Sequence, residues 1–144
     1  HGREHHHLTG GDMLFKDPMI KSSFTNSERL IMKEAVEDHR ASSKHEPRSI
    51  YGKIIAEADR DIDLETVIRR MIQFGFKHYP NLTKEEILER AKLHLHEKYG
   101  PHGYLKLWLS TKKNEEGLQK IHQLLKSETE LTKTLERIYE NEKK

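Results

Sequence analysis

The chain has 144 residues, of which 33% are apolar and 35% are charged, and its formal net charge is +2. It contains no cysteine, which excludes disulfides and thiolate metal sites, so any metal would need histidine, carboxylate or water ligands. The near balance of 26 basic and 24 acidic residues gives no strong overall field, so nucleic-acid binding is not expected.

A histidine-rich segment opens the chain at 1–7 and ends in three consecutive histidines, His5, His6 and His7. Two interpretations stay open. The segment is the scar of a purification tag, or the sequence begins inside a domain, as the missing initial methionine suggests. The first helix is predicted from about Glu4 to Lys16, because the proline that follows shortly after restricts the backbone of the residue before it.

The second predicted helix begins with a capping box. Thr25 precedes Glu28 by three residues, so each side chain can accept a hydrogen bond from the other residue's backbone. Along this helix Met32, Val36 and His39 follow at spacings of four and three, which places them on one face. The imidazole of His39 is therefore expected to point inward with the apolar stripe.

A polar loop leads to the next predicted helix, at about 48–60. There Tyr51, Ile55 and Asp59 follow one another at spacings of four. An ionised carboxylate on such a stripe is costly unless a cation or hydrogen-bond donors meet it. Asp59 is therefore the leading candidate for a metal ligand. The alternative is an ordinary residue at a helix end that pairs with a neighbouring arginine.

Three further helices are predicted in the second half of the chain. Asp63 is expected to cap the first of them, which ends before Pro80, and a second capping box begins the next at Thr83. The segment 102–109 is expected to form either a short helix or an extended connection. One long amphipathic helix is then predicted over about 114–140. The expected fold is all-α, with five to seven helices in a single domain over 1–144.

Three segments together resemble the HD superfamily of metal-dependent phosphohydrolases, and most closely its small stand-alone bacterial members. They are GREHHH at 2–7, EAVEDHR at 34–40 and YGKIIAEADR at 51–60. The similarity spans about residues 2–109, and the Ala-Asp-Arg of the third segment is its most specific part. In this family an all-helical domain binds a divalent metal through a histidine, a His-Asp pair and a distant aspartate.

The resemblance implies that Asp59 is the distant aspartate. The first histidine and the His-Asp pair do not occur in the sequence, and by analogy they would lie just before His1, so we expect the chain to be incomplete at its N-terminus. The resemblance also implies that His39 and one of His6 and His7 line the metal cleft, as ligands of a second metal or as phosphate contacts. Imidazole and carboxylate ligands would accept Mn, Fe, Ni, Co, Zn or Mg.

Five cationic residues are candidates for binding phosphate, because guanidinium and ammonium groups neutralise its oxygens. They are Arg40, Lys44, Lys53, Arg69 and Arg70. The resemblance favours one of the two adjacent arginines without choosing between them. The alternative for each residue is an ordinary solvated surface charge.

We therefore expect a metal-dependent phosphohydrolase that acts on a nucleotide or a related phosphoester, in which a divalent cation lowers the pKa of a water molecule. If the sequence is the whole molecule, weak metal affinity and little activity are expected. One alternative is a helical binding or interaction module with a structural or defunct metal site. A basic nucleic-acid binder is a second alternative, which the interleaved acidic residues oppose.

The expected location is the cytoplasm. No stretch approaches the roughly 20 apolar residues that cross a bilayer, so no membrane contact is expected. The only partner expected is the phosphoester substrate. The sequence leaves open whether the chain forms a homo-oligomer.

Overall fold

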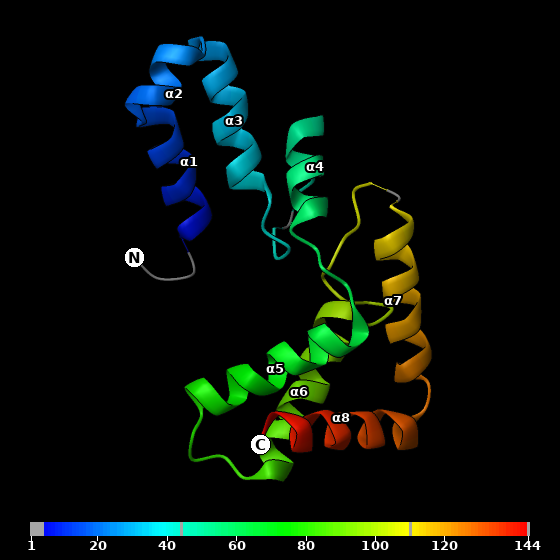
Figure 1. Ribbon diagram of the computed structural model, residues 1–144. Coiled ribbons are helices and arrows are strands. Elements are labelled where there is room, and N and C mark those ends of the chain that lie inside the picture. Colours follow the sequence, from blue (N-terminus) through cyan, green and yellow to red (C-terminus); the bar gives the residue numbers. More distant parts are fainter. Residues whose placement is uncertain (1–4, 44, 110, 144) are drawn as a thin grey trace. The chain divides into compact units, whose positions relative to one another are not determined.

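The computed structural model describes residues 5–43, 45–109 and 111–143. All regular structure within these ranges is helical, which confirms the expected all-α class. These ranges contain eight helices, more than the five to seven expected. They are α1 His6–Lys16, α2 Pro18–Ser23, α3 Asn26–Asp38, α4 Ile50–Ala58, α5 Leu64–His78, α6 Lys84–Tyr99, α7 Lys112–Leu125 and α8 Glu128–Glu142 (Figure 1).

The helices fall into two compact units. The first contains 5–60 without residue 44, together with the short segment 106–109, and the second contains 61–105 and 111–143. The first unit therefore holds α1 to α4, and the second holds α5 to α8. The single domain expected from the sequence remains a prediction.

In the first unit, α1 and α3 run antiparallel, side by side, and the short helix α2 joins them (Figure 1). The helix α2 is not among the predicted helices, because a proline after a helix also marks where that helix ends. Asp17 also begins α2: its carboxylate accepts from the backbone N–H groups of Met19 at 2.9 Å and Ile20 at 3.0 Å. Proline suits the first position of a helix, where its missing N–H has no intrahelical partner to lose.

The helix α3 begins with the predicted capping box. The backbone N–H of Thr25 donates to the Glu28 carboxylate at 2.8 Å, and the Glu28 N–H donates to the Thr25 hydroxyl at 3.3 Å. Its buried face, however, is rotated from the one expected. Ala35 and Asp38 are buried, whereas His39 and the rest of the predicted stripe are only half-buried.

The helix α4 packs through small residues. Gly52 and Ala56 are buried, and a Cβ atom at Gly52 would lie 3.0 Å from Pro47 Cβ and 3.4 Å from Asp38 Cβ. Because this face approaches its neighbours so closely, the large side chains of α4 lie elsewhere on the helix, and Tyr51 is 57% exposed. The prediction of an inward stripe of large side chains on this helix is therefore wrong.

The segment 106–109 belongs to the first unit although it is distant in sequence from the rest of that unit. Glu57, which is only 4% exposed, accepts from the backbone N–H groups of Trp108 at 3.2 Å and Leu109 at 3.4 Å. A buried carboxylate needs such donors, since an unpaired one is costly. Of the two forms left open for 102–109, the structure has the non-helical one.

The second unit has an apolar core to which all four of its helices contribute. The predicted caps of its first two helices are confirmed: Asp63 accepts from the Thr66 N–H at 2.9 Å, and Thr83 forms a capping box with Glu86. The largest side chains that are fully buried in this core are Ile68, Ile72, Leu95, Ile121 and Leu131.

The single helix predicted over 114–140 is instead two helices, α7 and α8. The break follows Lys126, and Ser127 begins α8 by accepting from the Glu130 N–H at 3.4 Å. The sequence contains this signal, because Ser127 and Glu130 have the spacing of a helix start. The apolar stripe also skips from Leu125 to Leu131, which a continuous helix would not favour.

Candidate functional site

Three imidazole rings meet where the start of α1 comes close to the end of α3. His6 and His7 lie in the first turn of α1, and His39 is the residue that ends α3. The ring centroids of His6 and His39 are 5.4 Å apart, and those of His6 and His7 are 5.7 Å apart, both with edge-to-face geometry. The structure thus brings His39 close to His6 and His7, one of which the resemblance placed with His39 at the metal cleft.

The ring of His39 is held in one orientation. Its Nδ1 lies 2.5 Å from the backbone carbonyl oxygen of Val36. Because a carbonyl oxygen only accepts, Nδ1 carries the proton, and Nε2 is left as the acceptor in the neutral ring. A backbone carbonyl that fixes one imidazole nitrogen in this way is a common partner of metal-binding histidines.

The imidazole of His7 is kept neutral by its surroundings. Burial lowers the pKa of His7, and the nearby charge of Arg40 and the neighbouring histidines lower it further. Its Nδ1 is buried and makes no hydrogen bond among the described residues. A neutral ring with an unsatisfied nitrogen is suited to bind a cation or to accept a proton.

Asp59 lies at the C-terminal cap of α4, where its backbone N–H donates to Ile55 O at 3.0 Å. Its side chain is exposed, on the same face as the exposed side chains of Tyr51 and Ile55. The expected burial of this carboxylate is therefore wrong, because Gly52 and Ala56 form the buried face instead. Its role as a metal ligand remains a prediction.

Asp38 is a buried carboxylate close to the histidines, and it is not among the predicted site residues. Asp38 is 3% exposed and lies at the end of α3, next to His39. It accepts from the Arg48 backbone N–H at 2.8 Å, from Nε at 3.1 Å and from Nη2 at 2.9 Å. Two features of the sequence indicate a role for Asp38 in this region. It shares a helix face with Ala35, and it directly precedes His39.

The pKa of Asp38 shows which effect dominates at this pair. Burial by itself raises the pKa, but the hydrogen bonds from the Arg48 side chain and backbone, together with its charge, outweigh burial and lower it. The same contacts raise the pKa of Arg48 above its usual value. The two groups are therefore an ion pair at neutral pH.

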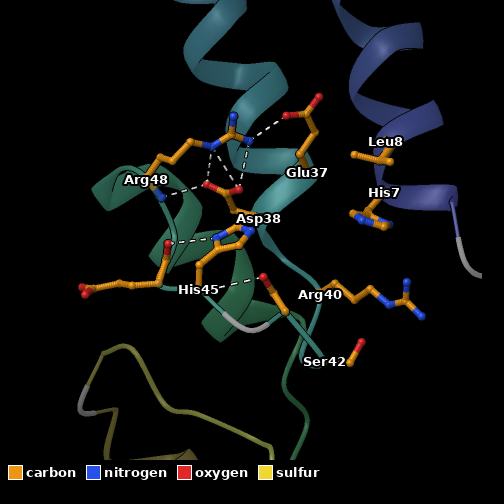
Figure 2. Close-up of a pocket in the computed structure, with 10 residues that line it drawn as sticks. His7, Leu8, Glu37, Asp38, Arg40, Ser42, His45 and Arg48 are labelled. Atoms are coloured by element: carbon orange, nitrogen blue, oxygen red, sulfur yellow. Dashed lines mark hydrogen bonds and ion pairs between the residues drawn. The ribbon is translucent and has the colours of Figure 1, made fainter.

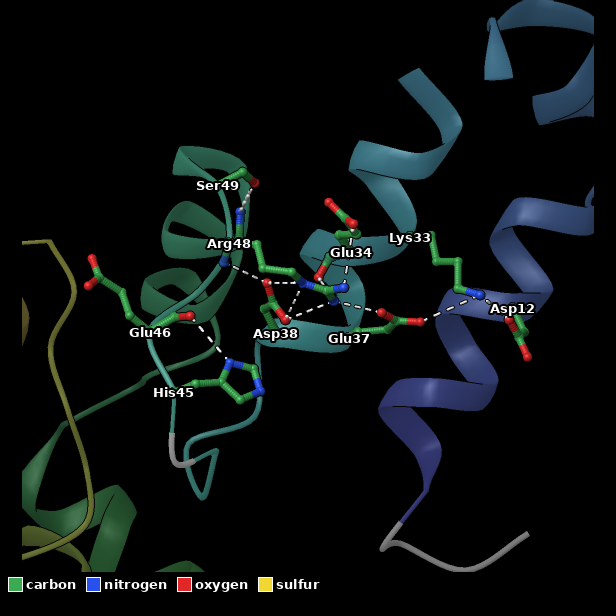
Figure 3. Close-up of polar contacts among 10 residues, drawn as sticks. Asp12, Lys33, Glu34, Glu37, Asp38, His45, Glu46, Arg48 and Ser49 are labelled. Atoms are coloured by element: carbon green, nitrogen blue, oxygen red, sulfur yellow. Dashed lines mark hydrogen bonds and ion pairs between the residues drawn. The ribbon is translucent and has the colours of Figure 1, made fainter. Parts of the chain in front are cut away.

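Arg48 also contacts the carboxylates of Glu34 and Glu37 (Figure 3). Its Nη2 donates to Glu37 at 2.6 Å, and its Nη1 lies 3.5 Å from the Glu34 carboxylate. Lys33 extends the network, 3.6 Å from Glu37 and 2.5 Å from Asp12 on α1. The network joins Arg48, in the loop after α3, to side chains on α1 and α3, and its acids accept from Nε and Nη2 of Arg48.

The five cationic residues predicted to bind phosphate lie in different parts of the structure. Arg40 lies beside His7 at a pocket of the first unit (Figure 2), and Lys53 pairs with Glu46. Arg69 and Arg70 belong to α5 of the second unit, where they pair with Glu142 at 3.1 Å and Asp61 at 3.4 Å. Lys44 lies outside the described residues. Of the five, Arg40 is the one that the structure brings to the histidines, and the others remain predictions.

The pocket beside the histidines has a volume of about 680 Å³ and belongs entirely to the first unit. In Figure 2, His7, Arg40 and Ser42 lie on one side of it, and His45 and Arg48 lie on the other. The residues that line it are His7, Leu8, Glu37, Asp38, Arg40, Ser42, Ser43, His45, Glu46 and Arg48.

The described residues contain no group of three or more histidine, aspartate or glutamate side chains arranged to hold a metal ion. The three imidazoles meet edge to face and do not converge on one point. None of the described helices combines the length and the apolar character that crossing a bilayer requires. Comparison of the chain with models of protein families, with curated proteins and with solved structures found no match.

Proposed function

We propose that the chain is a metal-dependent phosphohydrolase of the HD type, acting in the cytoplasm on a nucleotide or a related phosphoester. The observation that carries the proposal is the meeting of His6, His7 and His39 beside Arg40 in the first unit. It brings residues from two of the three segments that resemble the HD superfamily into one place.

The residues have roles that suit this chemistry. His39 offers Nε2 and His7 a neutral, unsatisfied ring, so both are proposed to hold a divalent cation together with Asp59. Such a cation supplies Lewis-acid activation of water and of the phosphoryl group. Arg40 would neutralise the phosphate oxygens through its planar fork of donors. In the reaction a water oxygen bonds to phosphorus, the P–O ester bond breaks, and the leaving alcohol gains a proton.

The test is phosphate release by the full chain, measured with Mn, Fe, Ni, Co, Zn and Mg on a panel of phosphoesters. The Asp59→Ala and His39→Ala variants should each reduce metal-dependent turnover by at least about 100-fold, with unchanged helical content. Asp12→Ala and His102→Ala are the matched controls and should retain the wild-type rate. Turnover unaffected by the first two variants would contradict the assignment.

A second candidate is an interaction module, and one observation favours it. Several large apolar side chains of the first unit are exposed, among them Met13, Met19, Ile50 and Tyr51, and exposed apolar patches often mark interaction sites. For this candidate, divalent metal would raise the melting temperature of the chain without phosphate release from any ester.

A further inference from the structure

The exposed side of α4 carries no charge. Every exposed residue of this helix is apolar, and together they make up what we call the α4 stripe: Ile50, Tyr51, Ile54, Ile55 and Ala58. With 3.6 residues per turn, these five positions fall within an arc of about 140°, so the stripe is continuous. An apolar stripe of this width is the side that a helix ordinarily turns towards a core.

The two charged residues of α4 lie on other sides of the helix and have partners there. Lys53 pairs with Glu46. Glu57 is buried and accepts from the backbone N–H groups of Trp108 and Leu109. The helix thus satisfies its charges within the first unit and leaves its large apolar side chains, which are 39% to 57% exposed, facing outward.

The first unit does not cover this stripe itself. Its longer helices form one layer, in which α3 contacts both α1 and α4, while α1 and α4 make no contact in the part of the chain that the structure describes (Figure 1). The apolar side chains buried in this unit are small, namely Ala35, Pro47 and Ala56. A domain ordinarily buries its apolar residues between two packed layers. The α4 stripe therefore needs a second layer from elsewhere.

The apolar surface that matches the stripe is the same stripe on a second copy of the chain. In the second unit the described residues include three exposed large apolar side chains, each on a different segment: Tyr79 at the end of α5, Leu93 on α6 and Tyr104 in the connection after α6. A charged surface placed against the stripe would lose water without gaining partners. Two copies of the stripe bury apolar side chains against each other, with no charge between them.

We propose that two copies of the chain associate through α4, with the two helices packed antiparallel about a twofold axis at Ile54, the central residue of the stripe. Because the same stripe serves both copies, association stops at a dimer. The exposed fractions of the four large side chains add up to about two whole side chains, on the order of 400 Å² per copy. Interfaces that bury less than about 1,200 Å² in total are weak, so the dissociation constant is expected to be on the order of 10 µM.

The test is sedimentation of the full chain from about 1 to about 500 µM, a range that brackets this constant. The wild type should change from monomer to dimer. Ile54→Glu should weaken association at least about tenfold, because it sets two carboxylates into an apolar contact at the axis. Leu93→Glu is the matched control, since Leu93 is 54% exposed and Ile54 is 49% exposed, and it should leave the dissociation constant unchanged.

Cross-linking tests the axis directly. The chain contains no cysteine, so a single introduced thiol reports on contact between copies. Ile54→Cys should give a disulfide-linked dimer on mild oxidation, because a disulfide needs the two Cα atoms within about 7 Å. Leu93→Cys should remain largely unlinked under the same conditions.

A chain that stays monomeric up to about 500 µM would overturn the proposal. So would a dimer that Ile54→Glu does not weaken or that Ile54→Cys does not link. A fall of more than about 5 °C in the melting temperature of Ile54→Glu at about 1 µM would overturn it too, because the stripe would then be buried within one chain. None of these measurements depends on phosphate release, so their outcome is independent of the proposed hydrolase function.

Discussion

In the second unit large apolar side chains from all four helices are buried together, whereas the buried apolar side chains in the described part of the first unit are small, namely Ala35, Ala56 and Pro47. Buried charges show the opposite distribution. Four of the five buried polar residues belong to the first unit, namely Arg29, Asp38, Glu57 and Arg60. Burial of apolar area therefore stabilises the second unit, while ion pairs and hydrogen bonds to buried charges organise the first.

The difference explains where a site is found. An apolar core tolerates few polar groups, because each needs a partner. The first unit already pairs its charges through Arg48 and around Glu57, so it can present imidazoles and a guanidinium in fixed positions. Its exposed surface is correspondingly apolar: ten large apolar residues are exposed there, against three in the second unit among the described residues.

The largest expected effect is in the second unit, at Gly117 of α7. A Cβ atom there would lie 1.9 Å from the backbone oxygen of Ile62, so α7 would have to move away from the chain that precedes α5. Gly117→Ala should lower the free energy of unfolding by about 3 kcal/mol or more, measured by urea denaturation. A neutral effect would show that the packing of this unit is looser than the structure has it.

The next effect is in the first unit. Asp38→Asn leaves the Arg48 guanidinium without its main partner and should cost about 2 to 3 kcal/mol, less than a fully buried pair because Arg48 is 43% exposed. The exposed Asp59→Asn in the same unit is the control and should change stability little. Hydrogen exchange should show the loss in α3 and α4 and leave α5 to α8 protected; an equal loss in both units would contradict the separation.

Low pH should weaken the ion pair between Asp38 and Arg48. Because the pKa of Asp38 is lower in the folded chain, its contribution is present above the unfolded value of about 4 and is lost as the pH falls through the folded value. Denaturation at pH 7 and pH 3 should therefore show a smaller loss for Asp38→Asn than for the wild type. Identical losses would show that this carboxylate titrates normally.

High pH should destabilise the second unit, because the pKa of Tyr99 is raised in the folded chain whereas that of Asp38 is lowered. Burial raises the pKa of Tyr99 to about 12, so the contribution of its neutral side chain is present below the unfolded value of about 10 and is lost as the pH rises through 12. Tyr99→Phe should remove up to about 2 kcal/mol of this pH dependence. Denaturation at pH 8 and pH 11 measures it, and parallel curves for both proteins would rule it out.

The smallest expected effect is a difference in stability between alanine substitutions at two adjacent glycines of α1, Gly10 and Gly11. A Cβ atom at Gly10 would make an ordinary contact, 3.5 Å from Val36 Cγ1, so Gly10→Ala should stabilise the helix by up to about 1 kcal/mol. At Gly11 the Cβ would lie 3.1 Å from the Lys33 carbonyl oxygen, which offsets that gain. Thermal unfolding of the two variants should place Gly10→Ala above Gly11→Ala; the reverse order would contradict the close approach of α1 to α3.

Local signals in the sequence located most helix starts. Thr25, Asp63 and Thr83 cap helices as predicted, because capping depends on a side chain and backbone groups within three residues of it. The same rule applies to Asp17 and Ser127, which cap α2 and α8, the two helices whose starts were not predicted. Both of these helix starts are therefore encoded by local side-chain chemistry.

The orientation of helix faces was harder. Spacing alone placed Tyr51, Ile55 and Asp59 inward, but α4 packs through Gly52 and Ala56. A stripe of large apolar side chains and a stripe of small ones are both periodic, and the choice between them depends on how closely a neighbouring helix approaches. The sequence contains the two stripes but not that distance.

The sequence by itself determined the all-α class, the principal caps and the histidines and arginine of the candidate site, because these follow from local geometry and residue chemistry. Only the tertiary structure decided that His6, His7 and His39 meet, that Asp38 is buried while Asp59 is exposed, and that Arg48 is the partner of Asp38. Those outcomes depend on contacts between helices, where packing distance and the need to pair every buried charge select one arrangement from several that the sequence pattern allows.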